Sequence, residues 1–168
     1  MNNTNMHDLP TALVSILKEK NRKIAAAESL TGGLVSKRIT EVSGASEVFE
    51  CGVCSYSNRI KHEILGVPSE ILETYTEYSS ETAIAMAEGV RKLSGADIAV
   101  STTGIAGPNG GTPEKPVGLV YVGISTQNHS FAKELHLSKG FEDERESIRF
   151  AASSYALYYA LKEMECTS

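Results

Sequence analysis

The sequence of 168 residues contains no tryptophan, only three cysteines and few other aromatic side chains. An odd number of cysteines does not suit the paired disulfide framework of a small secreted protein. Cys51 and Cys54 have the spacing of a redox motif, but they lie in a strand-like run, where this odd offset points them to opposite faces. No apolar run reaches the ~20 residues of a membrane helix, and the polar segment Met1–Pro10 lacks a signal core. We therefore expect a cytoplasmic protein that does not associate with membranes.

Basic residues are not in excess, because 16 lysines and arginines stand against 21 aspartates and glutamates, a net charge of −5. Such a chain lacks the basic surface of a general nucleic-acid binder, so we expect a small-molecule partner. The four histidines form no pair at helical spacing, and no metal or other cofactor is predicted. The length suits one domain over residues 1–168, with residues 1–7 frayed at its start.

Hydrophobic periodicity and turn residues predict strands that alternate with helices early in the chain and pair as a hairpin near its end. The predicted strands cover residues 23–27, 48–55, 98–102, 117–125 and 130–137. The first predicted helix begins after Asp8, the second covers residues 34–42, and the third lies between Ser57 and Gly66. The fourth begins at Pro68, the fifth runs from a Ser80 cap to about residue 93, and the sixth covers about residues 142–164. This order predicts a three-layer α/β/α sandwich around a mixed sheet.

Ser29 lies where the first predicted strand ends and a helix is about to begin, in the segment A-A-E-S-L-T-G-G. Free backbone N–H groups at such a point carry partial positive charge and can stabilise an alkoxide or an oxyanion. Gly32 and Gly33 allow the backbone to approach a ligand closely. The alternative is that Ser29 or Thr31 only caps the next helix, which from this segment alone is the commoner role.

Lys61 lies three residues after Asn58, so both share a face if a helix begins at Ser57. A lysine can act as the base for a serine nucleophile. To be neutral near pH 7, its pKa must fall about three units from 10.4, roughly 4 kcal/mol of differential solvation. Burial or a neighbouring cation such as Arg59 or Arg145 can supply this shift. Otherwise Lys61 is an ordinary solvated lysine.

A glycine- and proline-rich loop over residues 104–116 directly follows a predicted buried strand. In open α/β sheets, ligands bind beyond the carboxyl ends of the strands. So long a loop in a small domain favours a functional role over a mobile surface connection. Its glycine spacing matches neither a Walker loop nor G-x-G-x-x-G.

Arg145 and Arg149 lie four residues apart near the start of the last predicted helix, so they share a face. Two guanidinium groups at a helix start could clamp a phosphate. The alternative is an exposed face on which they pair with Glu142 and Glu146, and this is the commoner arrangement.

Together these segments resemble the CinA C-terminal domain family, the nicotinamide-nucleotide amidohydrolases. The matching stretches lie in family order between about residues 9 and 164, and they are A-A-E-S-L-T-G-G-L, Y-S-N-x-x-K followed by L-G-V-P, S-x-E-T-A-x-A-M-A-E-G, T-G-I-A-G-P-x-G-G-T-P-E-K-P-V-G and R-E-x-x-R. The resemblance implies hydrolysis of the carboxamide of nicotinamide mononucleotide to nicotinic acid mononucleotide and ammonia, in pyridine nucleotide recycling. It implies no cofactor.

The same resemblance implies roles for individual residues. Ser29 corresponds to the nucleophile and Lys61 to its base. Contacts with the substrate or with an oxyanion are expected at nine further positions: Tyr56, Asn58, Thr31, Gly32, Gly33, Thr103, Gly104, Gly107 and Arg145.

Two other functions stay open at this point. The chain could be a nucleotide-binding regulatory module of the same fold without turnover, although the retained Ser29 and Lys61 argue against this. It could also be a hydrolase for a different amide. In each case we expect a homo-oligomer.

Overall fold

The chain folds around a single five-stranded sheet. The computed structural model describes residues 8–137 and 144–166. The helices are α1 (Leu9–Glu19), α2 (Leu34–Thr40), the 3-10 turn η1 (Ala45–Glu47), α3 (Asn58–Leu65), α4 (Ser69–Tyr75), α5 (Ser80–Ser94) and α6 (Glu144–Cys166), and the strands are β1 (Ile24–Glu28), β2 (Phe49–Cys54), β3 (Ile98–Gly104), β4 (Leu119–Ser125) and β5 (Ser130–His136). The predicted frayed start at 1–7 and the predicted helix start at 142 lie outside the described residues.

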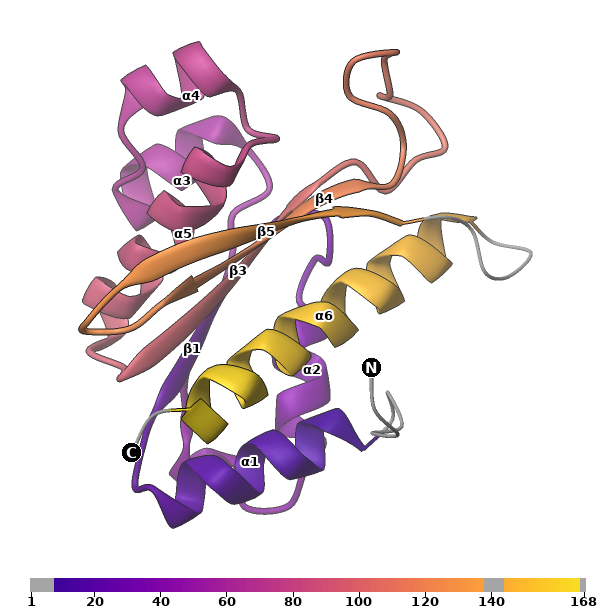
Figure 1. Cartoon of the computed structure of the whole chain (residues 1–168). Coiled ribbons are helices and arrows are strands. Elements are labelled where there is room, and N and C mark those ends of the chain that lie inside the picture. The colour runs from indigo at the N-terminus through magenta and orange to yellow at the C-terminus, as the bar shows by residue number, and fades with distance from the viewer. Residues whose placement is uncertain (1–7, 138–143, 167–168) are drawn as a thin grey trace.

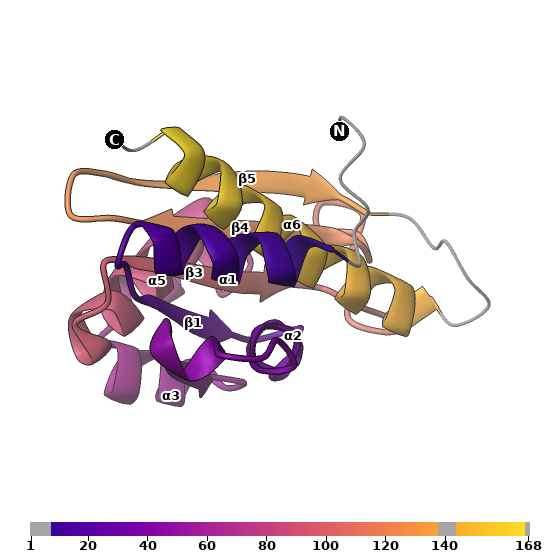
Figure 2. The ribbon, with the colours of Figure 1, turned by 90° about the horizontal axis from the view of Figure 1, so that it is seen from below.

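The sheet is mixed and has the strand order β2-β1-β3-β4-β5. Strand β1 is parallel to β2 and β3, whereas β4 is antiparallel to β3 and β5. Helices α1, α2 and α6 cover one face, and α3, α4 and α5 cover the other (Figure 1). Figure 2 shows α1 and α6 side by side on their face of the sheet. The predicted three-layer α/β/α sandwich is therefore confirmed.

The burial of the strands explains their composition. Strands β1 and β3 are buried along their whole length because both faces are covered by helices. Each begins with the apolar run that is typical of such strands and carries polar residues toward its end, Glu28 in β1 and Ser101 to Thr103 in β3. Strand β2 lies at the edge of the sheet and alternates between half-buried and exposed positions. Its Cys51 is half-buried and its Cys54 exposed, and both are free thiols.

Close packing of α3 against α5 places Lys61. A Cβ at Gly89 of α5 would lie 1.9 Å from the main-chain oxygen of Leu65, so only glycine allows this approach. Helix α3 begins with a Ser57 side chain that accepts a hydrogen bond from the Ile60 N–H, and it ends at Gly66, as predicted. Lys61 and Leu65 lie four residues apart and therefore share one face of α3. This face packs toward the interior, so both side chains are buried.

Helix α5 begins one residue away from the predicted cap. The Ser79 side chain, not that of Ser80, accepts a hydrogen bond from the N–H of Thr82. Ser79 has extended backbone angles, which an N-cap residue requires, whereas Ser80 is the first helical residue. The predicted end of this helix at Gly95 is confirmed.

Candidate active site

The carboxyl ends of the three parallel strands meet at one edge of the sheet. Glu28, the last residue of β1, pairs with Cys54 of β2 and with Thr102 of β3. Ser29, the next residue, extends the pairing with β3 by donating its N–H to the main-chain oxygen of Thr102 at 2.9 Å. Ser55 donates its N–H to the main-chain oxygen of Glu28 at 2.8 Å. The turn after β1 and the start of the β2–α3 connection therefore lie side by side.

The structure brings Ser29 and Lys61 into contact. The Lys61 Nζ atom lies 3.1 Å from Ser29 Oγ, within hydrogen-bond distance, and donates to the main-chain oxygen of Ser55 at 2.9 Å. Both side chains are buried, with Lys61 only 1% exposed. Thirty-two residues separate the two groups along the chain, so the fold alone creates the pair.

The surroundings of Lys61 favour its neutral form. Burial lowers the pKa of the amine from its ordinary value, and the nearby charge of Glu77 raises it but only in part. Among the described residues, no carboxylate forms an ion pair with Lys61. A neutral amine in contact with a hydroxyl can accept its proton, which is the chemistry of a Ser-Lys nucleophile and base.

The hydroxyl of Ser55 is an exception among the buried polar groups beside this pair. Within the part of the chain that the structure describes, Ser55 Oγ is the one fully buried side-chain polar atom without a hydrogen-bond partner. Its main-chain oxygen is engaged by Lys61 and its N–H by Glu28. Ser55 therefore acts on the amine through its backbone.

Glu28 organises the turn that follows β1. Its buried carboxylate accepts five hydrogen bonds at 2.6–3.0 Å. The donors are the Thr31 and Ser36 hydroxyls and the N–H groups of Gly33, Val35 and Ser36. The interpretation that Ser29 or Thr31 caps α2 is therefore wrong, since the carboxylate of Glu28 takes the free amides of the helix start. Sequence reasoning missed Glu28 because cap rules favour shorter side chains next to the helix.

The oxyanion site predicted at Thr31 to Gly33 needs correction. The N–H of Gly32 donates to the main-chain oxygen of Ser29 at 3.1 Å, and the N–H of Gly33 donates to Glu28 at 3.0 Å. These two amides are therefore occupied within the protein. Both glycines have positive φ, which the tight turn requires. The Thr31 side chain is fully buried and bonds Glu28 and Thr102, so it presents no hydroxyl to a ligand.

The start of the glycine-rich loop closes over the same edge of the sheet. The Thr103 hydroxyl donates to the main-chain oxygen of Glu77. Gly104 has a φ of 152°, and a Cβ there would lie 2.4 Å from the main-chain oxygen of Leu119. The oxygen of Gly107 accepts a hydrogen bond from Arg145 Nη1 at 2.6 Å. Helix α6 and the loop therefore meet directly beside the Ser29 turn.

The two arginines of α6 bind different partners. Arg145 Nη2 donates to the hydroxyl of Tyr56 at 2.9 Å, and the Tyr56 side chain is 64% exposed at the rim. Arg149 instead donates to the main-chain oxygens of Leu30 and Thr31. The two guanidinium groups therefore do not form the joint phosphate clamp that their spacing suggested.

Glu77 and Tyr78 lie beside the candidate site and were not found from the sequence. Asn58 Nδ2 lies 3.4 Å from a carboxylate oxygen of Glu77. Burial and the neighbouring Glu77 raise the pKa of Tyr78. No local pattern marks either residue, because they reach the site only through the connection between α4 and α5.

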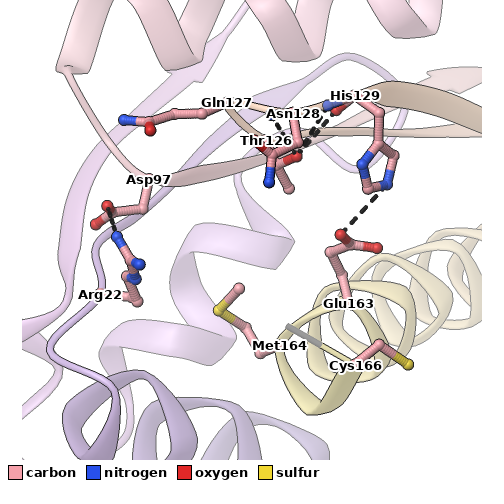
Figure 3. A pocket seen from close by; sticks show the side chains of 9 residues that line it. All are labelled: Arg22, Asp97, Thr126, Gln127, Asn128, His129, Glu163, Met164 and Cys166. Atoms are coloured by element: carbon pink, nitrogen blue, oxygen red, sulfur yellow. Dashed lines mark hydrogen bonds and ion pairs between the residues drawn. The ribbon is translucent and has the colours of Figure 1, made fainter. Parts of the chain in front are cut away.

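A separate open cavity of about 510 Å³ lies at the opposite end of the sheet (Figure 3). It is lined by residues that precede β1 and β3, by the β4–β5 turn and by the end of α6, and includes Arg22, Asp97, His129 and Glu163. Arg22 contacts Asp97 at 2.7 Å and His129 contacts Glu163 at 3.3 Å. None of the predicted site residues lies there.

The described residues contain neither a candidate metal site nor a candidate membrane-spanning helix. No group of three or more histidine, cysteine, aspartate or glutamate side chains within 8–137 and 144–166 could hold a metal ion. No described helix is long and apolar enough to cross a membrane.

Comparisons with known proteins agree with the fold and the motifs. The family model described as the CinA C-terminal domain matches residues 6–164. The nicotinamide-nucleotide amidohydrolase PncC of Enterobacter agglomerans is 41% identical over 97% of this chain and 98% of its own length. The crystal structure of the competence/damage inducible protein CihA from Agrobacterium tumefaciens has a TM-score of 0.90 and 34% identity, over 98% of both chains.

Other relatives are much longer than this chain. A CinA-like protein of Geotalea uraniireducens is 45% identical over 93% of the chain, which covers 36% of that relative. The chain spans about a third of the length of several curated relatives that it matches, 35–37%. The family match and the full-length similarity to PncC show that the chain belongs to the CinA C-terminal domain family.

Proposed function

We propose that this chain hydrolyses the carboxamide of nicotinamide mononucleotide, giving nicotinic acid mononucleotide and ammonia. The observation that carries the proposal is the 3.1 Å contact between Ser29 Oγ and the buried amine of Lys61. The PncC relative, which is similar over nearly the whole chain, bears the name of this activity.

The reaction proceeds in two halves with Ser29 as nucleophile. Neutral Lys61 accepts the hydroxyl proton while Ser29 Oγ attacks the amide carbon, and the carbonyl electrons move to oxygen. As the tetrahedral intermediate collapses, the C–N bond breaks and the Lys61 ammonium gives its proton to the departing nitrogen, which leaves as ammonia. Lys61 then takes a proton from the water that attacks the acyl-enzyme and returns it to Ser29, releasing the acid.

The backbone of Ser55 keeps the amine of Lys61 in place during both halves. One N–H of the neutral amine donates to the Ser55 oxygen, so the nitrogen lone pair is free for the hydroxyl of Ser29. Burial favours the uncharged amine at rest. The ammonium that forms is transient, because the leaving nitrogen takes its proton.

Tyr56, Asn58 and Arg145 at the rim of the site hold the substrate in this proposal. The buried Thr103, Gly104 and Gly107 line the site behind them. Arg145 is the proposed phosphate ligand, since two of its five N–H donors bond Tyr56 and Gly107 and no acceptor among the described residues takes the other three. Arg149 is less suited, because it is engaged with the turn after β1.

The remaining expectations follow from this activity. The proposed enzyme is a single amidohydrolase domain over residues 1–168 that works in pyridine nucleotide recycling in the cytoplasm. We also propose that it forms a homo-oligomer, which sedimentation of the purified chain would test.

Ammonia release from nicotinamide mononucleotide tests the proposal. The wild type should release ammonia, and Ser29→Ala should abolish the release while the protein stays folded. Thermal stabilisation by the nucleotide without ammonia release would instead identify a binding module. Equal turnover of nicotinamide riboside, which lacks the phosphate, would indicate a hydrolase for a different amide. Full activity in Ser29→Ala would refute the assignment of the nucleophile.

A further inference from the structure

Arg149 reaches from α6 to the turn that carries Ser29. Its Nε donates to the main-chain oxygen of Leu30 at 3.1 Å, and its Nη2 donates to the main-chain oxygen of Thr31 at 2.8 Å. The guanidinium also lies close to Gly32, since a Cβ at that position would be in ordinary contact with Nη2 at 3.4 Å. The planar fork of an arginine suits two neighbouring acceptors, so this contact fixes two consecutive peptide units.

The contact also determines where the N–H groups of these peptides point. In a planar trans peptide, C=O and N–H lie on opposite sides. A guanidinium that holds the Leu30 carbonyl therefore directs the Thr31 N–H, which belongs to the same peptide, away from Arg149. The next peptide is held at both ends, because Arg149 binds the Thr31 oxygen and the Gly32 N–H donates to Ser29.

Two N–H groups of the turn lack an acceptor within the part of the chain that the structure describes. Among the described residues, nothing accepts a hydrogen bond from the N–H of Leu30 or of Thr31, although both residues are buried. Buried backbone N–H groups are nearly always paired, so these two call for an acceptor. Successive N–H groups form a concavity that binds anions, and the N–H after a nucleophilic serine is an oxyanion donor in α/β-hydrolases.

We infer that Arg149 is a positioning residue that orients the Thr31 N–H, beside the Leu30 N–H of the preceding peptide, to bind the oxyanion formed when Ser29 attacks the amide. This inference rests on the proposed function. Arg149 itself does not touch the substrate. The amides of Gly32 and Gly33, which the sequence predicted as oxyanion donors, are occupied. The two amides that directly follow the nucleophile take their place as donors.

Arg149→Met tests the inference against a matched control. Loss of one oxyanion donor typically lowers kcat about 10²-fold or more, so we expect kcat for ammonia release to fall about 100-fold with KM nearly unchanged. Arg149→Lys should recover only part of this loss, because one ammonium cannot reproduce the fork. Arg91→Met removes an arginine of α5 that bonds Ser125 at the end of β4, away from the site, and this variant should keep the wild-type kcat.

A second readout needs no nucleotide. A p-nitrophenyl phosphonate labels an activated serine through a transition state with a negatively charged phosphoryl oxygen, and mass spectrometry measures the rate at Ser29. Labelling should slow about as much as kcat in Arg149→Met and stay unchanged in Arg91→Met. Circular dichroism at the assay temperature shows the folded fraction of each variant.

The outcomes separate the inference from the proposed function. A raised KM with unchanged kcat, unchanged labelling, or losses that match the unfolded fraction would overturn the role of Arg149 and leave the amidohydrolase intact. Slower labelling in Arg149→Met, with a wild type that labels but does not release ammonia, would support Arg149 and refute the proposed substrate. A wild type that neither labels nor releases ammonia would refute both.

Discussion

The two ends of the sheet hold charged groups in opposite ways. At the amino ends of β1 and β3, Arg22 pairs with Asp97 beside an open cavity, and both are partly exposed (Figure 3). At the carboxyl ends, Lys61 and Glu28 are each 1% exposed, and among the described residues neither contacts a group of opposite charge. Neutral hydroxyls and backbone groups hold them instead.

This difference distinguishes structural from functional charge. An exposed ion pair is worth about 0–1 kcal/mol, and its loss leaves both groups in water. A buried ionisable group without an opposite charge is costly, so a fold keeps it only where neutral partners or a change of protonation compensate. Glu28 has five hydrogen bonds, and burial lowers the pKa of Lys61. The candidate active site therefore lies at the carboxyl ends of the strands, whereas the amino ends carry ordinary surface electrostatics.

Lys61→Met, which removes the buried amine at the carboxyl ends of the strands, should have the largest effect. Without the base, kcat for ammonia release should fall about 10³-fold or more, because serine and base act as a unit. The unfolding midpoint in urea should stay the same or rise, because an apolar side chain of similar length replaces a buried amine. A variant that keeps its activity would remove Lys61 from the mechanism.

The same variant should change the pH dependence of stability. Because the pKa of Lys61 is lowered in the folded state, the unfolded chain binds more protons between that pKa and the ordinary value of about 10.4. The unfolding free energy of the wild type therefore rises with pH in this window. Lys61→Met should lose this contribution, which urea unfolding at a series of pH values would measure.

Glu28→Gln should produce the next largest effect. The amide can accept at only one of its two atoms, so several of the five donors lose their acceptor, and the free energy of unfolding should fall by about 2–3 kcal/mol. Ammonia release should fall as well, since Ser29 adjoins the turn that loses these hydrogen bonds in the variant. Glu41→Gln, on the exposed surface of the same helix region, is the control and should unfold like the wild type. Equal stability of Glu28→Gln would contradict the role of the carboxylate.

Glu77→Gln should move the pH profile without removing activity. The charge of Glu77 raises the pKa of Lys61, so its neutralisation should lower that pKa further. Since neutral Lys61 is the active form in the proposed mechanism, the acidic limb of the profile of kcat against pH should move to lower pH. A shift to higher pH would show that Glu77 does not act on Lys61 by its charge.

Arg22→Met, at the amino end, should have the smallest effect. Loss of the partly exposed pair with Asp97 should lower the free energy of unfolding by at most about 1 kcal/mol. Ammonia release should equal that of the wild type. A marked loss of activity would mean that the two ends of the sheet are coupled.

Local sequence patterns predicted the fold but only part of the site. The layers, the mixed sheet and the ends of α3 followed from burial patterns and capping residues that act over a few positions. The cap of α5 was misplaced by one residue because two serines adjoin, and only the extended backbone of Ser79 separates them.

The contacts within the site were beyond local rules. Ser29 and Lys61 were recognised through the family resemblance, but their meeting depends on the close packing of α3 under α5 at Gly89. Glu28 reaches amides five to eight residues ahead across a turn with two left-handed glycines. Arg149 reaches its partners from more than one hundred residues away. Such contacts arise from tertiary packing, and no spacing in the sequence encodes them.

The most direct test of a neutral amine beside Ser29 is an NMR titration of the lysine side chains in the folded protein. The Lys61 Cε and Nζ signals are assigned by their absence in Lys61→Met. Burial predicts that Lys61 titrates at a lower pH than the exposed lysines of the same chain. A Lys61 midpoint at or above those of the exposed lysines would contradict the Ser-Lys mechanism.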